Sequence, residues 1–302
     1  MTMRILITGA SGLVGSALSE RLSTQGHSIS RLVRHQANTS RGEAYWSPEG
    51  GSVDKSGIDQ LKPEIVINLA GENIAGGRWN DERKRKIRDS RVNGTRALAD
   101  TLAHLEIKPK AFICASAIGF YGSRGDEPLT EDSSPGEGFL AEVCQEWEEA
   151  SERAAKAGIR TVNLRIGVVL SPEGGALKKM LLPFKLGVGG VIGSGRQYMS
   201  WIALDDLVKV IEYAIQNESL RGPVNAVAPD PVTNKEFTKT LGRVLWRPTC
   251  LPMPASTARM LIGEMADALL LASTRVVPAK LEKSGFKFDH PGLKGALTQL
   301  LK

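Results

Sequence analysis

The sequence predicts an α/β fold, namely a Rossmann-type, doubly wound parallel sheet followed by a smaller C-terminal α+β lobe. Apolar, strand-like runs alternate with amphipathic stretches over residues 5–170, which is typical of a parallel sheet with helices on both faces. The first apolar run leads directly into a glycine-rich turn and an amphipathic stretch, the context in which dinucleotides bind. After residue 170 the alternation of strand-like and amphipathic stretches becomes irregular, which indicates a second lobe.

We therefore expect two units. Residues 1–170 form an NADP-binding Rossmann domain, to which later strands also contribute. Residues 171–302 form a smaller lobe on the substrate side, and its last part, residues 248–302, is helical with proline interruptions. The helices of this tail either pack back on the lobe or form the face of a homodimer, and the sequence leaves both open.

The composition is that of an ordinary globular protein, with 41% hydrophobic and 24% charged residues among 302. No apolar run approaches the length of a membrane span, so we expect no membrane partner. The three cysteines, Cys114, Cys144 and Cys250, are scattered and lack metal-ligand spacing. We therefore expect no metal site and a reducing, cytoplasmic location.

The glycine turn predicts a cradle for a diphosphate. Gly9 lets the chain turn sharply, Gly12 lets a pyrophosphate approach the backbone, and Gly15 lets the helix lie against the strand. The first N–H groups of the new helix and its positive dipole end then face the anion.

The end of the second predicted strand, residues 28–34, indicates which dinucleotide binds. An acidic residue there selects a free ribose hydroxyl, whereas an arginine pairs with the 2′-phosphate of NADP. This chain has Arg34 followed by His35, and its next carboxylate is Glu43. We therefore predict NADP(H); the alternative is that Arg34 is only a surface charge.

A buried strand is predicted at residues 64–71, after a polar, glycine-rich stretch at 36–62 that we interpret as a loop with a short hairpin. Ligands bind outside the carboxyl ends of parallel strands. We expect Leu69 and Ala70 to pass along the adenine and ribose, and Glu72 to point towards the crevice.

A basic helix follows, with Asn80 as its predicted N-cap and Ala103 near its end. Part of the net charge of +6 comes from residues 83–88 of this helix. No aromatic residues are interleaved with this run, so we interpret it as a solvated face near a phosphate-bearing cofactor and expect no nucleic-acid partner.

The next strand, residues 111–117, ends on small and hydroxyl residues, among them Ser116, and Tyr121 comes shortly after it. We expect the polar, acidic residues 123–137 to form a loop over the site. A helix at 138–156 and one long apolar strand at 161–170 are predicted after that loop.

At this point the whole chain resembles the extended short-chain dehydrogenase/reductase superfamily of the sugar-nucleotide epimerase type. Within it, the chain is most similar to the epimerase-like family with an additional C-terminal domain of unknown function. The stretches that carry the resemblance are TGASGLVG at residues 8–15, NLAGENI at 68–74, RWN at 78–80, SRVNGT at 90–95, LPFKLG at 182–187, GSG at 193–195, WI at 201–202, RVVP at 275–278 and GF at 285–286.

The resemblance implies NADP(H) and assigns roles to residues of this chain. The residues implied to hold the diphosphate are Gly9, Ser11, Gly12, Leu13 and Val14. Arg34 would take the 2′-phosphate, and Arg91 would face the cofactor from the basic helix, since a guanidinium fits phosphate in a bidentate manner. Leu69, Ala70 and Glu72 would line the crevice.

The chain departs from the superfamily at its catalytic pair, a Tyr and a Lys spaced Y-x-x-x-K. Here residues 139–144 read FLAEVC, and neither a phenylalanine nor a valine can move a proton. Ser116 and Tyr121 are the catalytic candidates that remain. Two hypotheses follow: an NADP(H)-dependent reductase or epimerase of a small-molecule substrate, with an unusual proton donor, or a catalytically inactive NADP(H)-binding regulatory protein.

Overall fold

The computed structural model describes residues 2–302 and is built around one eight-stranded sheet in the order β12-β8-β6-β5-β1-β2-β3-β4. All neighbouring strands run parallel except β4, which is antiparallel to β3. The strands of the sheet are β1 (Arg4–Thr8), β2 (Ser28–Val33), β3 (Glu43–Ser47), β4 (Ser52–Val53), β5 (Ile65–Asn68), β6 (Ala111–Ala117), β8 (Arg160–Ile166) and β12 (Gly222–Ala226). The predicted Rossmann-type sheet is thereby confirmed.

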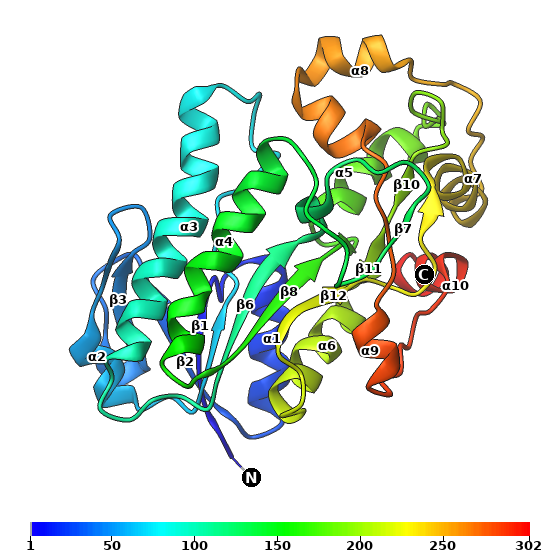
Figure 1. Cartoon of the computed structure of the whole chain (residues 1–302). Helices are drawn as coiled ribbons and strands as arrows, with labels where there is room; N and C mark the ends of the chain where they lie inside the picture. The colour runs from blue at the N-terminus through cyan, green and yellow to red at the C-terminus, as the bar shows by residue number, and fades with distance from the viewer. Residues whose placement is uncertain (1) are drawn as a thin grey trace.

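Helices cover both faces of this sheet (Figure 1). α1 (Leu13–Thr24) and α6 (Leu204–Gln216) share one apolar core with alternate residues of the strands, such as Ile5 and Ile7. α3 (Asp81–Ala103) and α4 (Phe139–Lys156) pack on the opposite face, where Leu6 and Phe112 belong to a second core. This two-sided burial explains why the strands are continuous apolar runs.

A smaller lobe surrounds a separate core that includes Leu181, Trp201 and Leu241. Its helices are α5 (Gly175–Lys185), α7 (Asn234–Leu245), α8 (Ala255–Ile262) and α10 (Leu293–Leu300), together with a π-helical turn at Asp267–Leu271. The remaining helix of this part of the chain, α9 (Ala279–Lys283), packs against β12, and its Leu281 belongs to the core of the main sheet. Three two-stranded sheets belong to it or join it to the first unit: β9 (Val168–Leu170) with β11 (Trp201–Ala203), β10 (Tyr198–Met199) with β13 (Val232–Thr233), and β7 (Pro128–Leu129) with β14 (Arg275–Val276).

The long strand predicted at residues 161–170 is in fact two strands, and this correction explains how the lobes join. β8 stays in the main sheet, whereas β9 pairs with β11. The break lies at Gly167, whose N–H donates to the carbonyl of Ala226, while Val168 N–H donates to the carbonyl of Ser200. The chain therefore leaves the sheet at the carboxyl end of β8.

Two other segments also differ from expectation. The hairpin predicted within residues 36–62 exists as β3 and β4, but β3 is also a strand of the main sheet, and the same segment contains the unpredicted helix α2 (Lys55–Leu61). Residues 123–137 are irregular, as expected of a loop, except at β7, which pairs with β14 and so ties the segment to the tail of the chain. A 3-10 turn, η2 (Ile118–Tyr121), precedes that segment.

Within residues 2–302, no helix is both long and apolar enough to cross a bilayer. The same residues hold no group of three or more His, Cys, Asp or Glu that could bind a metal ion.

Candidate functional site

The glycine turn between β1 and α1 has the predicted geometry. Gly9 has a φ of 67°, and a Cβ there would lie 2.9 Å from the carbonyl carbon and oxygen of Leu69. A Cβ on Gly15 would lie 2.1 Å from the carbonyl oxygen of Gly9. Side chains at these two positions would force apart the turn, the helix and the loop after β5, so the close packing requires glycine.

The first turn of α1 is suited to an anion. Gly12 is the N-cap, and no side chain caps the helix there. Ser11 and Gly12 are exposed, and Leu13 and Val14 are partly buried. The first N–H groups of a helix have no intrahelical partners, and the helix dipole adds positive charge at the same place. The backbone of residues 11–14 can therefore receive a diphosphate.

Two buried polar side chains connect this turn to the loop after β5. The Thr8 hydroxyl donates to Asn68 Oδ1 at 2.6 Å and accepts from the N–H groups of Leu69 and Ala70 at 3.1 Å each. Asn68 Nδ2 donates to the Thr95 hydroxyl at 2.8 Å. The positions of Leu69 and Ala70 beside the turn thus depend on Thr8 and Asn68. Sequence reasoning missed both, although each is a polar residue that ends a buried apolar strand.

Arg34 directly follows β2 and is exposed. No ion pair or hydrogen bond of its guanidinium is found within residues 2–302, whereas His35 next to it lies 3.8 Å from a carboxylate oxygen of Glu43. The Arg34 guanidinium therefore remains available at the strand end where the sequence predicted recognition of a 2′-phosphate.

Glu72 and Arg91 form part of the support for the loop after β5. Glu72 Oε1 lies 2.7 Å from Arg83 Nη1, and the Glu72 carbonyl accepts from Arg91 Nη2 at 3.0 Å. Arg91 Nη1 donates to the carbonyl of Ile87, and its guanidinium lies over the Trp147 ring. Burial lowers the pKa of Arg91. These contacts hold Arg91 beneath the loop and leave its remaining N–H groups for a ligand.

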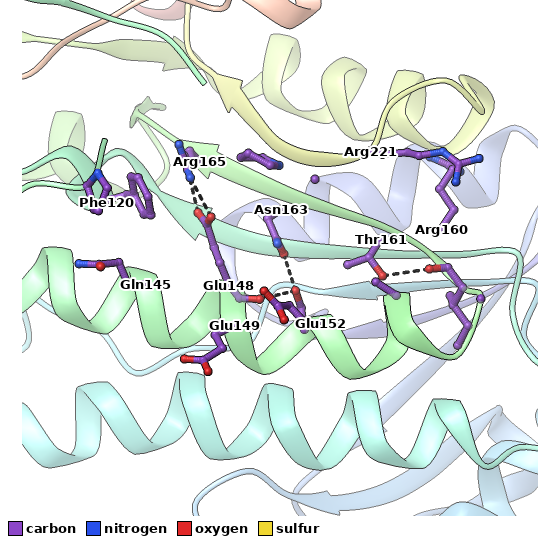
Figure 2. A pocket seen from close by; sticks show the side chains of 17 residues that line it. Phe120, Gln145, Glu148, Glu149, Glu152, Arg160, Thr161, Asn163, Arg165 and Arg221 are labelled. Carbon is purple, nitrogen blue, oxygen red and sulfur yellow. Dashed lines mark hydrogen bonds and ion pairs between the residues drawn. The ribbon is translucent and has the colours of Figure 1, made fainter. Parts of the chain in front are cut away.

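Ser116, one of the two predicted catalytic residues, lies at the carboxyl end of β6 but is 3% exposed. Its hydroxyl donates to Glu148 Oε1 of α4 at 2.7 Å. The same carboxylate receives two hydrogen bonds from the buried Arg165 of β8, at 2.8 and 2.9 Å (Figure 2). The Ser116 proton is therefore directed to a paired carboxylate.

The structure does not support the predicted role of Tyr121 as a proton donor. Its side chain is fully buried, its hydroxyl donates to Asn225 Oδ1 at 2.7 Å, and the same oxygen accepts from Arg165 Nη1 at 2.8 Å. Burial raises the pKa of Tyr121, which opposes ionisation near neutral pH. Proximity to Ser116 in sequence suggested a shared site, but η2 turns the phenol into the core.

The positions where the superfamily has its Tyr and Lys are occupied by apolar packing. The Phe139 ring meets Trp79 edge to face with centroids 5.2 Å apart, and Lys84 Nζ lies 5.3 Å from the Phe139 centroid. Val143 is 2% exposed. The start of α4 therefore supplies no proton donor at these two positions.

A groove of about 600 Å³ lies between α4 and the strands β8 and β12. Glu148 and Arg165 line one part of it, and Thr161 and Asn163 also line it (Figure 2). None of the residues predicted to bind the cofactor borders this groove. The groove is thus distinct from the glycine turn.

The sheet, the glycine turn and the helix that follows define the class as a Rossmann-type protein of the short-chain dehydrogenase/reductase kind. Residues 5–226 match the model of the NAD dependent epimerase/dehydratase family, and the chain belongs to that family. Residues 253–300 match a second model, a domain of unknown function named DUF1731. The predicted resemblance, including the separate C-terminal segment, is confirmed.

Relatives match along nearly the whole chain. An epimerase family protein of Mycobacterium bovis is 43% identical over 97% of this chain and 96% of its own length. The human epimerase family protein SDR39U1 is 33% identical over 99% of this chain and 100% of its own. A crystal structure of human SDR39U1 (isoform 2) with NADPH is similar with a TM-score of 0.88, at 32% identity and 99% coverage of both chains.

Proposed function

We propose that this protein binds NADP(H) and acts as an epimerase- or reductase-like oxidoreductase on a small molecule. The observation that carries the proposal is the exposed, uncapped start of α1, packed against the loop after β5 through Gly9 and Gly15. The human relative at 32% identity was crystallised with NADPH, which supports the same cofactor here.

The residues present fit this cofactor. The backbone of Gly9, Ser11, Gly12, Leu13 and Val14 would hold the diphosphate, and Arg34 would pair with the 2′-phosphate. Leu69 and Ala70, held by the Thr8 hydroxyl, would border the adenosine. Glu72 and Arg91 would close the same crevice. When bound, the nicotinamide supplies or accepts a hydride at a substrate carbon.

The proton step is the part of the chemistry that the chain's side chains must provide. Ser116 lies at the end of β6, and its hydrogen bond to Glu148 leaves its oxygen lone pairs for a substrate hydroxyl. We keep Ser116 as the residue that would orient the substrate oxygen and withdraw Tyr121, whose hydroxyl is used within the core.

A second function is favoured by the same contacts. Phe139 and Val143 stand where the superfamily has its proton-transferring Tyr and the Lys that activates it, and Tyr121 is fully buried. A protein that retains the cofactor but has no proton donor would act as a catalytically inactive NADP(H)-binding regulatory protein.

Turnover separates the two functions. NADPH oxidation is followed against a panel of aldehydes and ketones. Formation of the epimerised product is followed for sugar nucleotides, because an epimerase returns the hydride and leaves no net change in the cofactor. Ser116→Ala is the test variant and Tyr121→Phe the comparison. Turnover that is lost in Ser116→Ala and retained in Tyr121→Phe supports the oxidoreductase. Tight NADPH binding without turnover of any substrate in the panel supports the regulatory protein instead.

We also propose a cytoplasmic location, because Cys114, Cys144 and Cys250 are all free thiols, as expected in a reducing compartment.

A further inference from the structure

Exposed apolar side chains are concentrated on the smaller lobe. Of the nine large hydrophobic residues that are exposed within residues 2–302, seven belong to segments of this lobe. They are Leu182, Leu186, Val188, Trp246, Leu251, Met260 and Leu261. Scattered exposed residues need no explanation, but a concentration of this kind marks an interaction surface.

Hydrogen bonds join the chain segments that carry these residues. The end of α5 meets the segment after α7, since Arg247 Nε donates to the carbonyl of Lys185 at 2.9 Å. The N–H of Met253 donates to the carbonyl of Val191 at 2.8 Å, just before α8 begins. α8 and the loop leading into it lie at the end of the molecule opposite the N-terminus (Figure 1). We call residues 174–196 and 239–262 together the apolar–basic surface.

The charged residues within these two segments are all basic, whereas the exposed Glu173, Glu236 and Glu264 lie just outside them. The two segments contain four basic residues each and no Asp or Glu. The basic residues are Lys178, Lys179, Lys185, Arg196, Lys239, Arg243, Arg247 and Arg259. Among the described residues, only Arg259 of this set forms an ion pair, with Asp267. The surface therefore combines exposed apolar side chains with a net positive charge.

We propose that the apolar–basic surface docks on an anionic lipid bilayer. Lysine and arginine side chains attract anionic headgroups, while Trp and Leu side chains enter the interface between headgroups and acyl chains. A peripheral contact of this kind requires no spanning helix. It also revises the expectation of no membrane partner, which rested only on the missing apolar run.

The shape of the surface favours a bilayer over a peptide. Trp246 follows α7 in a left-handed conformation, with φ of 56°, and its side chain is 89% exposed. None of the seven apolar residues lines the groove beside α4 or a further groove at the start of α10. A protruding tryptophan suits insertion into lipid, whereas a bound peptide needs a concavity. A second copy docked through the same surface would meet charge of the same sign.

Vesicle flotation with the full chain tests the proposal. The probes are vesicles of phosphatidylcholine alone and vesicles containing roughly one third phosphatidylglycerol. We expect the protein to float with the anionic vesicles about tenfold more than with the neutral ones, and to be released by high salt. Trp246→Ser combined with Leu251→Ser, and separately Lys185→Gln combined with Arg243→Gln, should each reduce binding by about tenfold.

Matched variants outside the surface control for the loss of an exposed apolar side chain, or of positive charge, elsewhere on the protein. Ile107→Ser removes another exposed apolar side chain, and Arg96→Gln combined with Arg41→Gln removes two exposed positive charges. These variants should bind as the wild type does, and circular dichroism should show that every variant is folded. Equal flotation of surface and control variants, or no flotation at all, would overturn the proposal. Retention on immobilised poly-glutamate that depends on Trp246, without vesicle binding, would also overturn it and assign the surface to an acidic protein. NADPH binding is measured separately and does not enter this result.

Discussion

The hydroxyl of Thr8 is a single group that holds two parts of the proposed cofactor site together. It donates to Asn68 and accepts from the backbone of Leu69 and Ala70, and the Thr8 side chain is fully buried. A buried polar group that loses its partner keeps the full cost of its desolvation. The contribution of Thr8 should therefore be measurable both in the free energy of unfolding and in the affinity for NADPH.

Thr8→Val removes the hydroxyl at nearly constant volume and leaves Asn68 Oδ1 without that donor. We expect the free energy of unfolding, measured by urea denaturation, to fall by about 1–3 kcal/mol, and NADPH binding to weaken. Thr8→Ser retains the hydroxyl and serves as the control. A Thr8→Val protein as stable as Thr8→Ser would show that these hydrogen bonds contribute nothing.

Arg34 is the residue proposed to distinguish NADP from NAD. Arg34→Ala should weaken NADPH binding by roughly 1.5–3 kcal/mol, the range of a charge-assisted hydrogen bond, and leave NADH binding unchanged. Calorimetric titration with both nucleotides measures this, with the exposed Arg96→Ala as the control. Equal weakening of both nucleotides would mean that Arg34 does not contact the 2′-phosphate.

The three cysteines should differ sharply in reactivity. Burial raises the pKa of Cys114 and of Cys144 to about 12, so that their reactive thiolates are scarce at pH 8, whereas Cys250 is exposed. A thiol reagent should modify one cysteine per native chain at pH 8 and three after unfolding. Fast modification of Cys144 in the native protein would contradict its position on the buried face of α4.

At the scale of elements, the sequence predicted the βα units well because each strand is buried on both faces and reads as an apolar run. α3 and α4 begin within one residue of the predicted places, and Asn80 caps α3 through its side chain as expected. α2 was missed because only Ile58 and Gly57 of its seven residues are buried. The break between β8 and β9 was missed because both strands are apolar. They differ only in their partners, since β8 pairs with β6 and β9 pairs with β11.

The site was predicted less completely than the fold. Backbone conformation at Gly9 and Gly15 follows from residue type, so the turn could be read from the sequence. The contacts of Ser116 and Tyr121 could not, because their partners Glu148, Arg165 and Asn225 come from other elements and meet only in the folded chain.

The pair of Glu148 on α4 and Arg165 on β8 joins a helix to the sheet. Arg165 is 4% exposed; burial lowers its pKa, but the hydrogen bonds and charge of Glu148 outweigh burial and shift it upward. Glu148→Gln would leave a buried guanidinium without its counter-charge, so we expect the free energy of unfolding to fall by about 3 kcal/mol. Glu149→Gln on the same helix is the control, and equal stability of the two variants would refute this role.

The whole molecule consists of a sheet that carries the glycine turn and a lobe that meets it at the carboxyl ends of the strands. Contacts from the lobe reach the loop after β5, since Lys179 Nζ donates to the carbonyl of Ala75 and Arg78 Nε to the carbonyl of Leu261. The apolar–basic surface lies on the same lobe. A bilayer that binds this surface would therefore lie beside the segments that border the proposed cofactor crevice.

Calorimetric titration of the wild-type protein with NADPH, paired with thermal denaturation, tests whether the Gly9–Val14 turn binds the cofactor. We expect measurable binding, tighter for NADPH than for NADH. At a cofactor concentration about a hundredfold above the dissociation constant, the melting temperature should rise by roughly 4 °C. No heat of binding together with an unchanged melting temperature would contradict the assignment of the Gly9–Val14 turn as the cofactor site.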